Sequence, residues 1–160
     1  MSGRLAGRVA AITGSSRGIG RAVATAFLAE GAKVAVNSRD QAVADQVARE
    51  LGARAVGVGA DVATEAGAAA LVGGAVDAFG RLDVLVNNAG ITVAAHTLEL
   101  DLNTWQKVID LNMTAVSCAR AKPPVTCLSP VVVRSSTRRP CKLLRPFLSA
   151  SRMARAKPRW

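Results

Sequence analysis

A glycine-rich segment near the N-terminus constrains the fold of this chain more than any other feature. It reads Thr13-Gly14-Ser15-Ser16-Arg17-Gly18-Ile19-Gly20 and lies between an apolar run, residues 8–13, and a segment with helical spacing, residues 18–31. Its three glycines, in order, permit a tight turn, close approach of the backbone to a pyrophosphate, and close helix–strand packing. The following helix offers free N–H groups and a positive dipole end to phosphates. A strand–turn–helix context therefore predicts a phosphate-binding loop rather than a glycine turn without a ligand.

Apolar runs and helical segments alternate as far as residue 121. In the first helix Ile19, Val23 and Phe27 share one side, and the second helix has Asp40 as an N-cap candidate and Gly52 as its stop. This alternation predicts a Rossmann-type, doubly wound α/β fold, with a parallel sheet and helices on both faces. The expected strands are 8–13, 33–37, 53–60 and 82–87, and the expected helices are 18–31, 40–51, 64–79 and 102–121.

The composition changes abruptly near residue 117. Residues 1–112 carry all 11 acidic residues and 10 of the 21 basic ones, so the net charge of +10 arises entirely beyond them. All six prolines and all three cysteines follow the change, and all 14 glycines precede it. We therefore expect a truncated Rossmann-type region over residues 1–121 and a poorly ordered, basic tail over residues 122–160.

Three further motifs follow the glycine-rich segment in order: Asp61-Val62, Asn87-Asn88-Ala89-Gly90 and Asn112. With the glycine spacing, they resemble the cofactor-binding half of the short-chain dehydrogenase/reductase family. The resemblance implies that Asp61 caps an adenine ring, that Asn88 belongs to a cofactor-lining motif and that Asn112 is catalytic. Each residue alone would also suit a cap or turn. The expected cofactor-binding residues are Gly14, Ser15, Ser16, Arg17, Gly18, Ile19, Gly20, Ser38, Arg39, Asp61, Val62, Asn88, Ala89 and Gly90.

Charge at the end of the second expected strand bears on the choice of dinucleotide. A free ribose diol is usually held by an acidic residue there, but the sequence reads Asn37-Ser38-Arg39 and the first acid is Asp40. The guanidinium groups of Arg17 and Arg39 suit a 2′-phosphate. The sequence thus favours NADP(H) over NAD(H). The alternative is that Arg39 is a solvated surface residue and Asp40 only a helix cap.

The family implied by the resemblance transfers hydride between nicotinamide and a carbonyl or alcohol, using a tyrosine, a lysine four residues later and a serine. This chain contains no tyrosine. Ser135 and Ser136 follow a short apolar run that faintly resembles the strand carrying the family's serine. The preferred interpretation is that both serines belong to an irregular tail. His96 is an unsupported substitute acid. We expect the chain to be inactive as written, with no metal site at its cysteines.

Three functions remain open on the sequence alone: an NADP(H)-dependent oxidoreductase, a non-catalytic nucleotide-binding fragment, and a basic-tail protein that binds nucleic acid or an anionic surface. The third ranks last, because the tail arginines show neither aromatic interleaving nor an amphipathic period. We expect a cytoplasmic protein without a membrane span. Its oligomeric state and substrate stay open, and loss of the remaining sheet predicts poor solubility or dependence on a partner. A coding frame shift near Ser117 or Cys118 would explain the tail.

Overall fold

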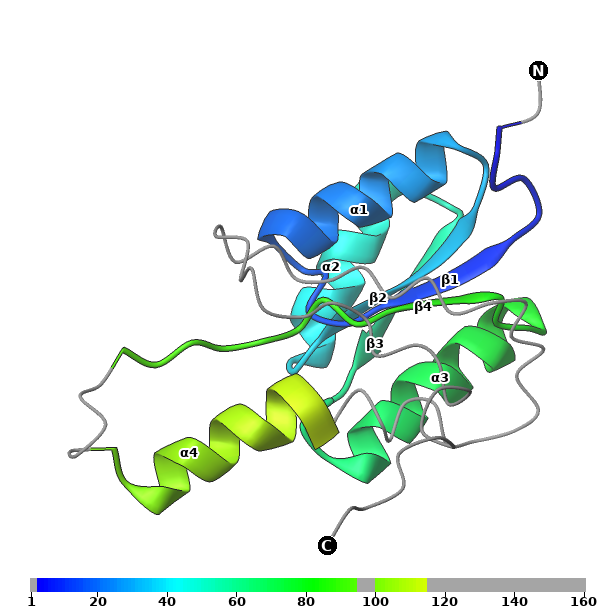
Figure 1. Cartoon of the computed structure of the whole chain (residues 1–160). Coiled ribbons are helices and arrows are strands. Elements are labelled where there is room, and N and C mark those ends of the chain that lie inside the picture. The colour runs from blue at the N-terminus through cyan, green and yellow to red at the C-terminus, as the bar shows by residue number, and fades with distance from the viewer. Residues whose placement is uncertain (1–2, 95–99, 115–160) are drawn as a thin grey trace, which may run out of the picture.

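The computed structural model describes residues 3–94 and 100–114, and within them the chain forms one four-stranded parallel sheet (Figure 1). Its strands are β1 (Val9–Ile12), β2 (Lys33–Ser38), β3 (Ala55–Gly59) and β4 (Val84–Val86). They are arranged in the order β3-β2-β1-β4, and each neighbouring pair is parallel. The order reverses at β1, so the chain passes from β3 back across the sheet to β4 on the other side of β1. This topology confirms the predicted Rossmann-type fold class.

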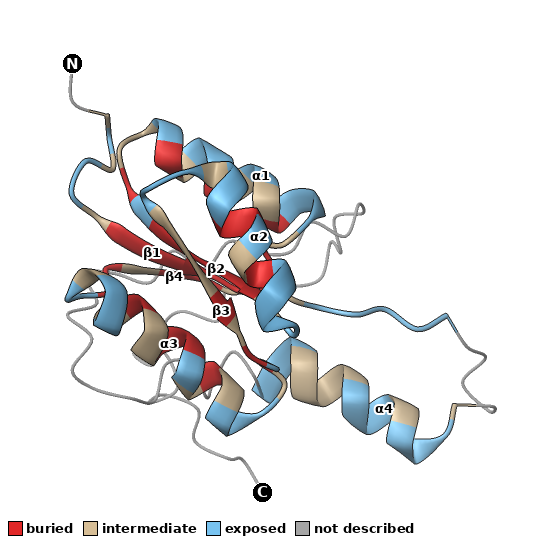
Figure 2. Cartoon of the chain, turned by 180° about the vertical axis from the view of Figure 1, so that it is seen from behind, coloured by how far each residue is buried: buried red, intermediate tan, exposed pale blue. Residues whose placement is uncertain are grey.

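Helices cover both faces of the sheet. The α-helices are α1 (Gly18–Ala29), α2 (Gln41–Leu51), α3 (Glu65–Phe79) and α4 (Leu102–Ile109), and a π-helix, η1 (Asp110–Thr114), continues directly from α4. Figures 1 and 2 show α1 and α2 on one face of the sheet and α3 on the opposite face, with α4 projecting beyond the sheet. The predicted placement of helices on both faces of a parallel sheet is therefore present in the described residues.

Alternate residues of β1 supply the two cores. Val9 and Ala11 pack with Leu71 and Ala75 of α3 and with neighbouring strand residues on one face. Ile12 packs on the other face with α1, α2 and the strands beside it. Because side chains of a strand alternate between faces, a central strand with helices on both sides must be apolar throughout, and all four residues of β1 are buried. Figure 2 shows this concentration of buried residues along β1 and β2.

A buried carboxylate fixes the amino-terminal ends of β1 and β4. Asp83 is 1% exposed, and its Oδ2 accepts from the Val9 N–H at 2.9 Å. Its Oδ1 accepts from Arg8 at 3.1 Å and also from Arg81. Burial alone would raise the pKa of Asp83, but the bonds from Val9, Arg81 and Arg8 outweigh it and hold the pKa below its ordinary value. The carboxylate is therefore ionised and structural.

The predicted helix ends agree closely with the structure. Asp40 caps α2 through its side chain, which accepts from the Ala42 N–H at 2.8 Å, and Gly52 ends the helix with φ at 98°. Thr64 caps α3 by accepting from the Gly67 N–H. The third and fourth strands are shorter than expected, at Ala55–Gly59 and Val84–Val86.

Two details of the helices differ from the sequence prediction. Ile19 is 60% exposed, whereas the buried row of α1 is Gly20, Ala24 and Leu28. The expected continuous α-helix after residue 102 changes to the wider π-helix at Asp110, and its extent beyond residue 114 lies outside the described residues. Three further predictions also concern residues outside the described part of the chain: those for His96, for Ser135 and Ser136, and for the tail over residues 122–160.

Candidate functional site

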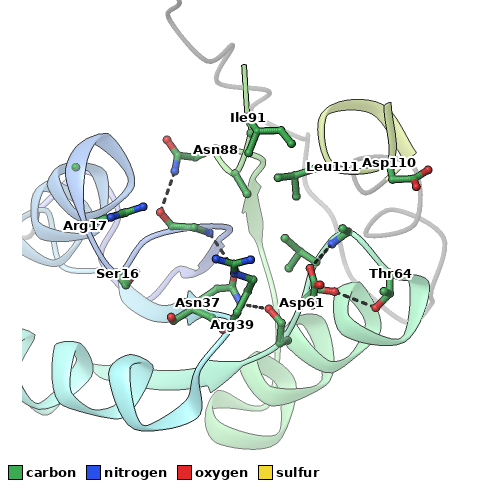
Figure 3. A pocket seen from close by; sticks show the side chains of 18 of the residues that line it. Ser16, Arg17, Asn37, Arg39, Asp61, Thr64, Asn88, Ile91, Asp110 and Leu111 are labelled. Atoms are coloured by element: carbon green, nitrogen blue, oxygen red, sulfur yellow. Dashed lines mark hydrogen bonds between the residues drawn. The ribbon is translucent and has the colours of Figure 1, made fainter. Parts of the chain in front are cut away.

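A cavity of about 1010 Å³ opens at the carboxyl ends of the strands, and we call it the carboxyl-edge pocket (Figure 3). Open α/β sheets bind ligands in this position, next to the strand where the order reverses. Four segments far apart in the sequence meet there: the loop after β1, the end of β2, the segment after β3 and the segment after β4. The lining residues are Gly14, Ser16, Arg17, Gly18, Ile19, Asn37, Ser38, Arg39, Val43, Ala60, Asp61, Val62, Ala63, Thr64, Asn88, Ala89, Gly90, Ile91, Lys107, Asp110 and Leu111.

The glycine-rich loop turns from β1 into α1 through positive-φ backbone. Gly14 has φ of 60° and Gly18 has φ of 58°, a region that side chains with a Cβ rarely adopt. A Cβ added at Gly18 would meet no atom within 4 Å, so the backbone there borders open space. A Cβ added at Gly20 would lie 2.5 Å from Asn88 Nδ2 and 2.6 Å from the Gly14 oxygen. Gly14 and Gly18 thus allow the turn, and the absence of a side chain at Gly20 lets Asn88 pack against the loop.

The head of α1 differs from the heads of the other described α-helices. Asp40, Thr64 and Asp101 cap α2, α3 and α4 through their side chains, whereas Arg17 at the N-cap of α1 makes no side-chain cap. The first N–H groups of an α-helix have no partner within the helix. Because the head of α1 faces the carboxyl-edge pocket, these donors are directed toward whatever occupies it.

Thr13 and Asn88 fasten the glycine-rich loop to the segment after β4. The Thr13 hydroxyl oxygen accepts from the backbone N–H groups of Asn88 at 2.9 Å and Ala89 at 2.8 Å. The Asn88 side-chain amide donates to the carbonyls of Thr13 at 3.0 Å and Gly14 at 3.2 Å. These bonds fix the spacing between two walls of the pocket.

Asp61 occupies the turn between β3 and α3. Its carboxylate accepts from the Ala63 N–H at 3.1 Å, and its carbonyl accepts from the Thr64 hydroxyl at 2.9 Å. A Cβ on Gly67 would lie 2.0 Å from the Asp61 carbonyl oxygen, so only glycine allows α3 to start this close. Asp61 itself is exposed toward the pocket, as Figure 3 shows.

Cationic side chains flank this acidic position. Arg17 and Arg39 are exposed at the pocket, and Lys107 lines it from α4. Asp40, beside Arg39 in sequence, does not line the pocket and uses its carboxylate to cap α2. The end of β2 therefore presents a guanidinium to the pocket and no carboxylate.

Asn112 lies on η1, where its side chain pairs with the backbone of Ile91. Its Oδ1 accepts from the Ile91 N–H at 3.0 Å, and its Nδ2 donates to the Ile91 carbonyl at 2.9 Å. Asn112 is not among the pocket-lining residues, although its neighbours Asp110 and Leu111 are. In this structure its amide holds the segment after β4 against η1.

Most of the predicted cofactor-binding residues line the carboxyl-edge pocket. The exceptions are Ser15 and Gly20, two buried residues of the glycine-rich loop. Ser15 is fully buried, and its hydroxyl donates to the Ile12 carbonyl at 2.7 Å and accepts from the Asn37 N–H at 2.9 Å. Sequence reasoning missed several lining residues, among them Asn37, Thr64, Ile91 and Lys107. A polar residue within an otherwise apolar strand was the available signal for Asn37.

No cluster of His, Cys, Asp and Glu suited to a metal ion occurs within residues 3–94 and 100–114. In the same part of the chain, every helix is too short or too polar to cross a lipid bilayer.

Residues 8–122 match the family described as short chain dehydrogenase. The chain belongs to the short-chain dehydrogenase family. It is 46% identical over 122 residues to a 3-oxoacyl-[acyl-carrier-protein] reductase of Synechocystis sp., covering 73% of this chain and 49% of that protein. It is 45% identical over 115 residues to glucose 1-dehydrogenase 2 of Bacillus subtilis, covering 69% and 45%. This short-chain dehydrogenase chain thus spans about half the length of the curated relatives it matches.

A solved structure shows the same arrangement of elements. The crystal structure of 3-ketoacyl-(acyl-carrier-protein) reductase from Brucella melitensis, complexed with NADH, superposes with a TM-score of 0.68 at 38% identity. The match covers 72% of this short-chain dehydrogenase chain and 48% of the Brucella chain.

Proposed function

We propose that the carboxyl-edge pocket binds a pyridine dinucleotide. The observation that carries this proposal is the convergence of the glycine-rich segment, the Asp61 motif and the Asn88 motif on one cavity at the reversal point of a parallel sheet. The uncapped head of α1 and the open space beside Gly18 fit a pyrophosphate, which accepts hydrogen bonds from backbone N–H groups at a helix N-terminus. The Brucella relative, solved with NADH, supports the same class of ligand.

In this proposal, different pocket residues contact different parts of the dinucleotide. The loop from Gly14 to Gly20 holds the pyrophosphate, Asp61 and Val62 border the adenine ring, and Asn88 to Gly90 line the path toward the nicotinamide. When bound, the nicotinamide supplies the site that accepts or donates hydride. The chain's own residues bind and orient the ligand.

We further propose a preference for NADP(H) over NAD(H). Arg17 and Arg39 both lie at the pocket, where their guanidinium groups suit the 2′-phosphate. Asp40 is the nearest acid in sequence to the end of β2, and its carboxylate is engaged with the N–H groups of Ala42 and Val43. A ribose diol therefore lacks the usual acidic partner at this strand end.

For the chain as written, we propose binding without turnover. Whole members of this family transfer hydride between nicotinamide and a carbonyl or alcohol, and the chain matches about half of such proteins. The sequence contains no tyrosine to exchange the proton with the substrate oxygen. Asn112, which the family resemblance makes catalytic, has its amide engaged with Ile91. A non-catalytic nucleotide-binding unit is therefore the favoured function of this polypeptide.

Cofactor fluorescence tests the binding proposal directly. Titrating the full chain into NADPH is expected to change the nicotinamide emission saturably, whereas absence of binding to NADPH and to NADH would refute the site. A panel of ketones with NADPH, and of alcohols with NADP⁺, tests the second claim. Turnover above that of a Gly18→Asp variant, which places a carboxylate where the pyrophosphate would bind, would refute inactivity.

The division into a nucleotide-binding region, residues 1–121, and a separate basic tail, residues 122–160, is also proposed. Translating the other two reading frames of the gene tests the frame-shift origin of the tail. If neither frame encodes a Tyr-x-x-x-Lys motif, the frame-shift origin is refuted. Cell fractionation tests the proposed cytoplasmic location.

A further inference from the structure

Asn37 is a polar residue in the middle of the buried structure. It lies near the end of β2, is 2% exposed and belongs to a run whose neighbours Val34, Ala35 and Val36 are fully buried. Asparagine is depleted in strands, and burying an amide is costly unless its donors and acceptor are satisfied. Its presence here therefore requires a set of specific partners.

The Asn37 side chain finds those partners in two walls of the carboxyl-edge pocket. Its Oδ1 accepts from the Gly14 N–H at 3.0 Å, in the glycine-rich loop. Its Nδ2 donates to the carbonyls of Val58 at 3.2 Å and Ala60 at 3.0 Å, at the end of β3. One planar amide thus joins the loop after β1 to the strand that leads into Asp61.

The backbone of Asn37 strengthens the same connection. Its N–H donates to the Ser15 hydroxyl at 2.9 Å, and its carbonyl accepts from the Ser15 N–H at 3.0 Å. Ser15 in turn donates to the Ile12 carbonyl at the end of β1. Asn37 therefore bonds to consecutive residues of the loop, Gly14 and Ser15, through side chain and backbone.

We propose that Asn37 is a positioning residue that holds the Gly14 loop and the Asp61 segment at the spacing required for one dinucleotide to span both. This inference rests on the proposed dinucleotide site. A ligand that touches only the Arg39 and Asp61 side needs one of these walls. A ligand that also uses the glycine-rich loop needs both walls at a fixed distance, so its affinity depends on the amide that sets that distance.

Comparing a whole ligand with a fragment separates positioning from general destabilisation. For Asn37→Ala, the dissociation constant of NADPH is expected to rise about tenfold, while that of adenosine, which lacks the phosphates assigned to the glycine-rich loop and to Arg17, rises less than about threefold. Asp83→Asn is the matched control, because it perturbs a buried, hydrogen-bonded side chain at the opposite end of the sheet by removing its charge. It is expected to leave the ratio of the two constants unchanged, at a temperature where circular dichroism shows each variant folded.

Failure of the inference is distinguishable from failure of the site. If the wild-type chain does not bind NADPH, the proposed function is wrong. If it binds but Asn37→Ala weakens both ligands by the same factor, Asn37 is not a positioning residue. Should the variant not fold, amide hydrogen exchange of the ligand-free wild type decides: a Gly14 N–H that exchanges as fast as an unbonded loop amide overturns the proposal, and slow exchange supports it.

Discussion

The side-chain amide of Asn112 pairs with both backbone groups of Ile91, through bonds of 3.0 and 2.9 Å. The pair joins η1 to the segment that follows β4, although 20 residues separate the two positions in the sequence. It coincides with the change from α-helix to π-helix at Asp110. Such insertions of a wider turn are frequent at functional sites, and here the turn brings Leu111 to the pocket.

Replacing Asn112 with alanine should loosen this wall. Two hydrogen bonds are lost at once, so the free energy of unfolding should fall by about 1–2 kcal/mol. Urea titration followed by Trp105 fluorescence, in a Trp160→Phe background, measures the change. Asn103→Ala is the control, because Asn103 is an exposed asparagine on α4. Equal stability of the two variants would contradict the role assigned to the pair.

Replacing Arg39 with glutamine should weaken NADPH selectively. A charge-assisted hydrogen bond to the 2′-phosphate is lost, so its dissociation constant should rise about tenfold to a hundredfold. NADH lacks that phosphate and should change less than about twofold. Fluorescence titration with both dinucleotides measures the ratio, with the exposed Arg49→Gln on α2 as control. A parallel loss of both affinities would argue against recognition of the 2′-phosphate.

Two helical glycines provide a matched test of the loop packing. A Cβ at Gly20 would lie within 3 Å of Asn88, Gly14 and Ser15, whereas a Cβ at Gly73 would meet nothing within 4 Å. Gly20→Ala should therefore lower the free energy of unfolding by about 1–3 kcal/mol. Gly73→Ala should raise it by about 0.5–1 kcal/mol, since alanine favours a helix interior. Chemical denaturation measures both changes, and a Gly20→Ala variant as stable as the wild type would show that the loop adjusts freely.

The Asp83 carboxylate should make stability depend on pH in the acid range. Its pKa is lower in the folded chain than the ordinary value of 3.8, so its contribution is fully present above that value and is lost as the pH falls through the folded pKa. Asp83→Asn should lower the free energy of unfolding at pH 7 by about 1–3 kcal/mol. Urea midpoints from neutral to acid pH should show the gap between variant and wild type narrowing below about pH 4. A gap that stays constant at lower pH would contradict the assignment.

The exposed face of α4 should promote self-association. Leu102 is 76% exposed and Trp105 is 52% exposed, and α4 has no buried residue. Exposed apolar patches on isolated chains favour aggregation. A double Leu102→Gln, Trp105→Gln variant should sediment as a smaller species than the wild type at equal concentration. A monomeric wild type with a cooperative melt would refute this prediction and the expectation of poor solubility.

Local sequence signals predicted the sheet and the glycine-rich loop, because buried parallel strands and helix caps depend on residues close together in the chain. The Asp40 cap and the Gly52 stop are examples. The role of Asn37 was missed, because its partners Gly14 and Ala60 lie 23 residues away on either side. Ile19 was placed with Val23 and Phe27, because periodicity alone does not distinguish a core from the wall of a cavity. The π-helix was missed for a similar reason, since Asn112 pairs with a distant backbone.

The elements that line the pocket differ in how tightly they pack into the rest of the fold. The segments that follow β1, β2, β3 and β4 are anchored to the sheet, whereas the wall formed by α4 with η1 contains no buried residue. A ligand lodged against Leu111 and Lys107 would tether that wall to the rest of the domain. By linkage, occupancy should then protect the backbone amides of η1 from exchange more strongly than those of β1, whose protection is already near its maximum.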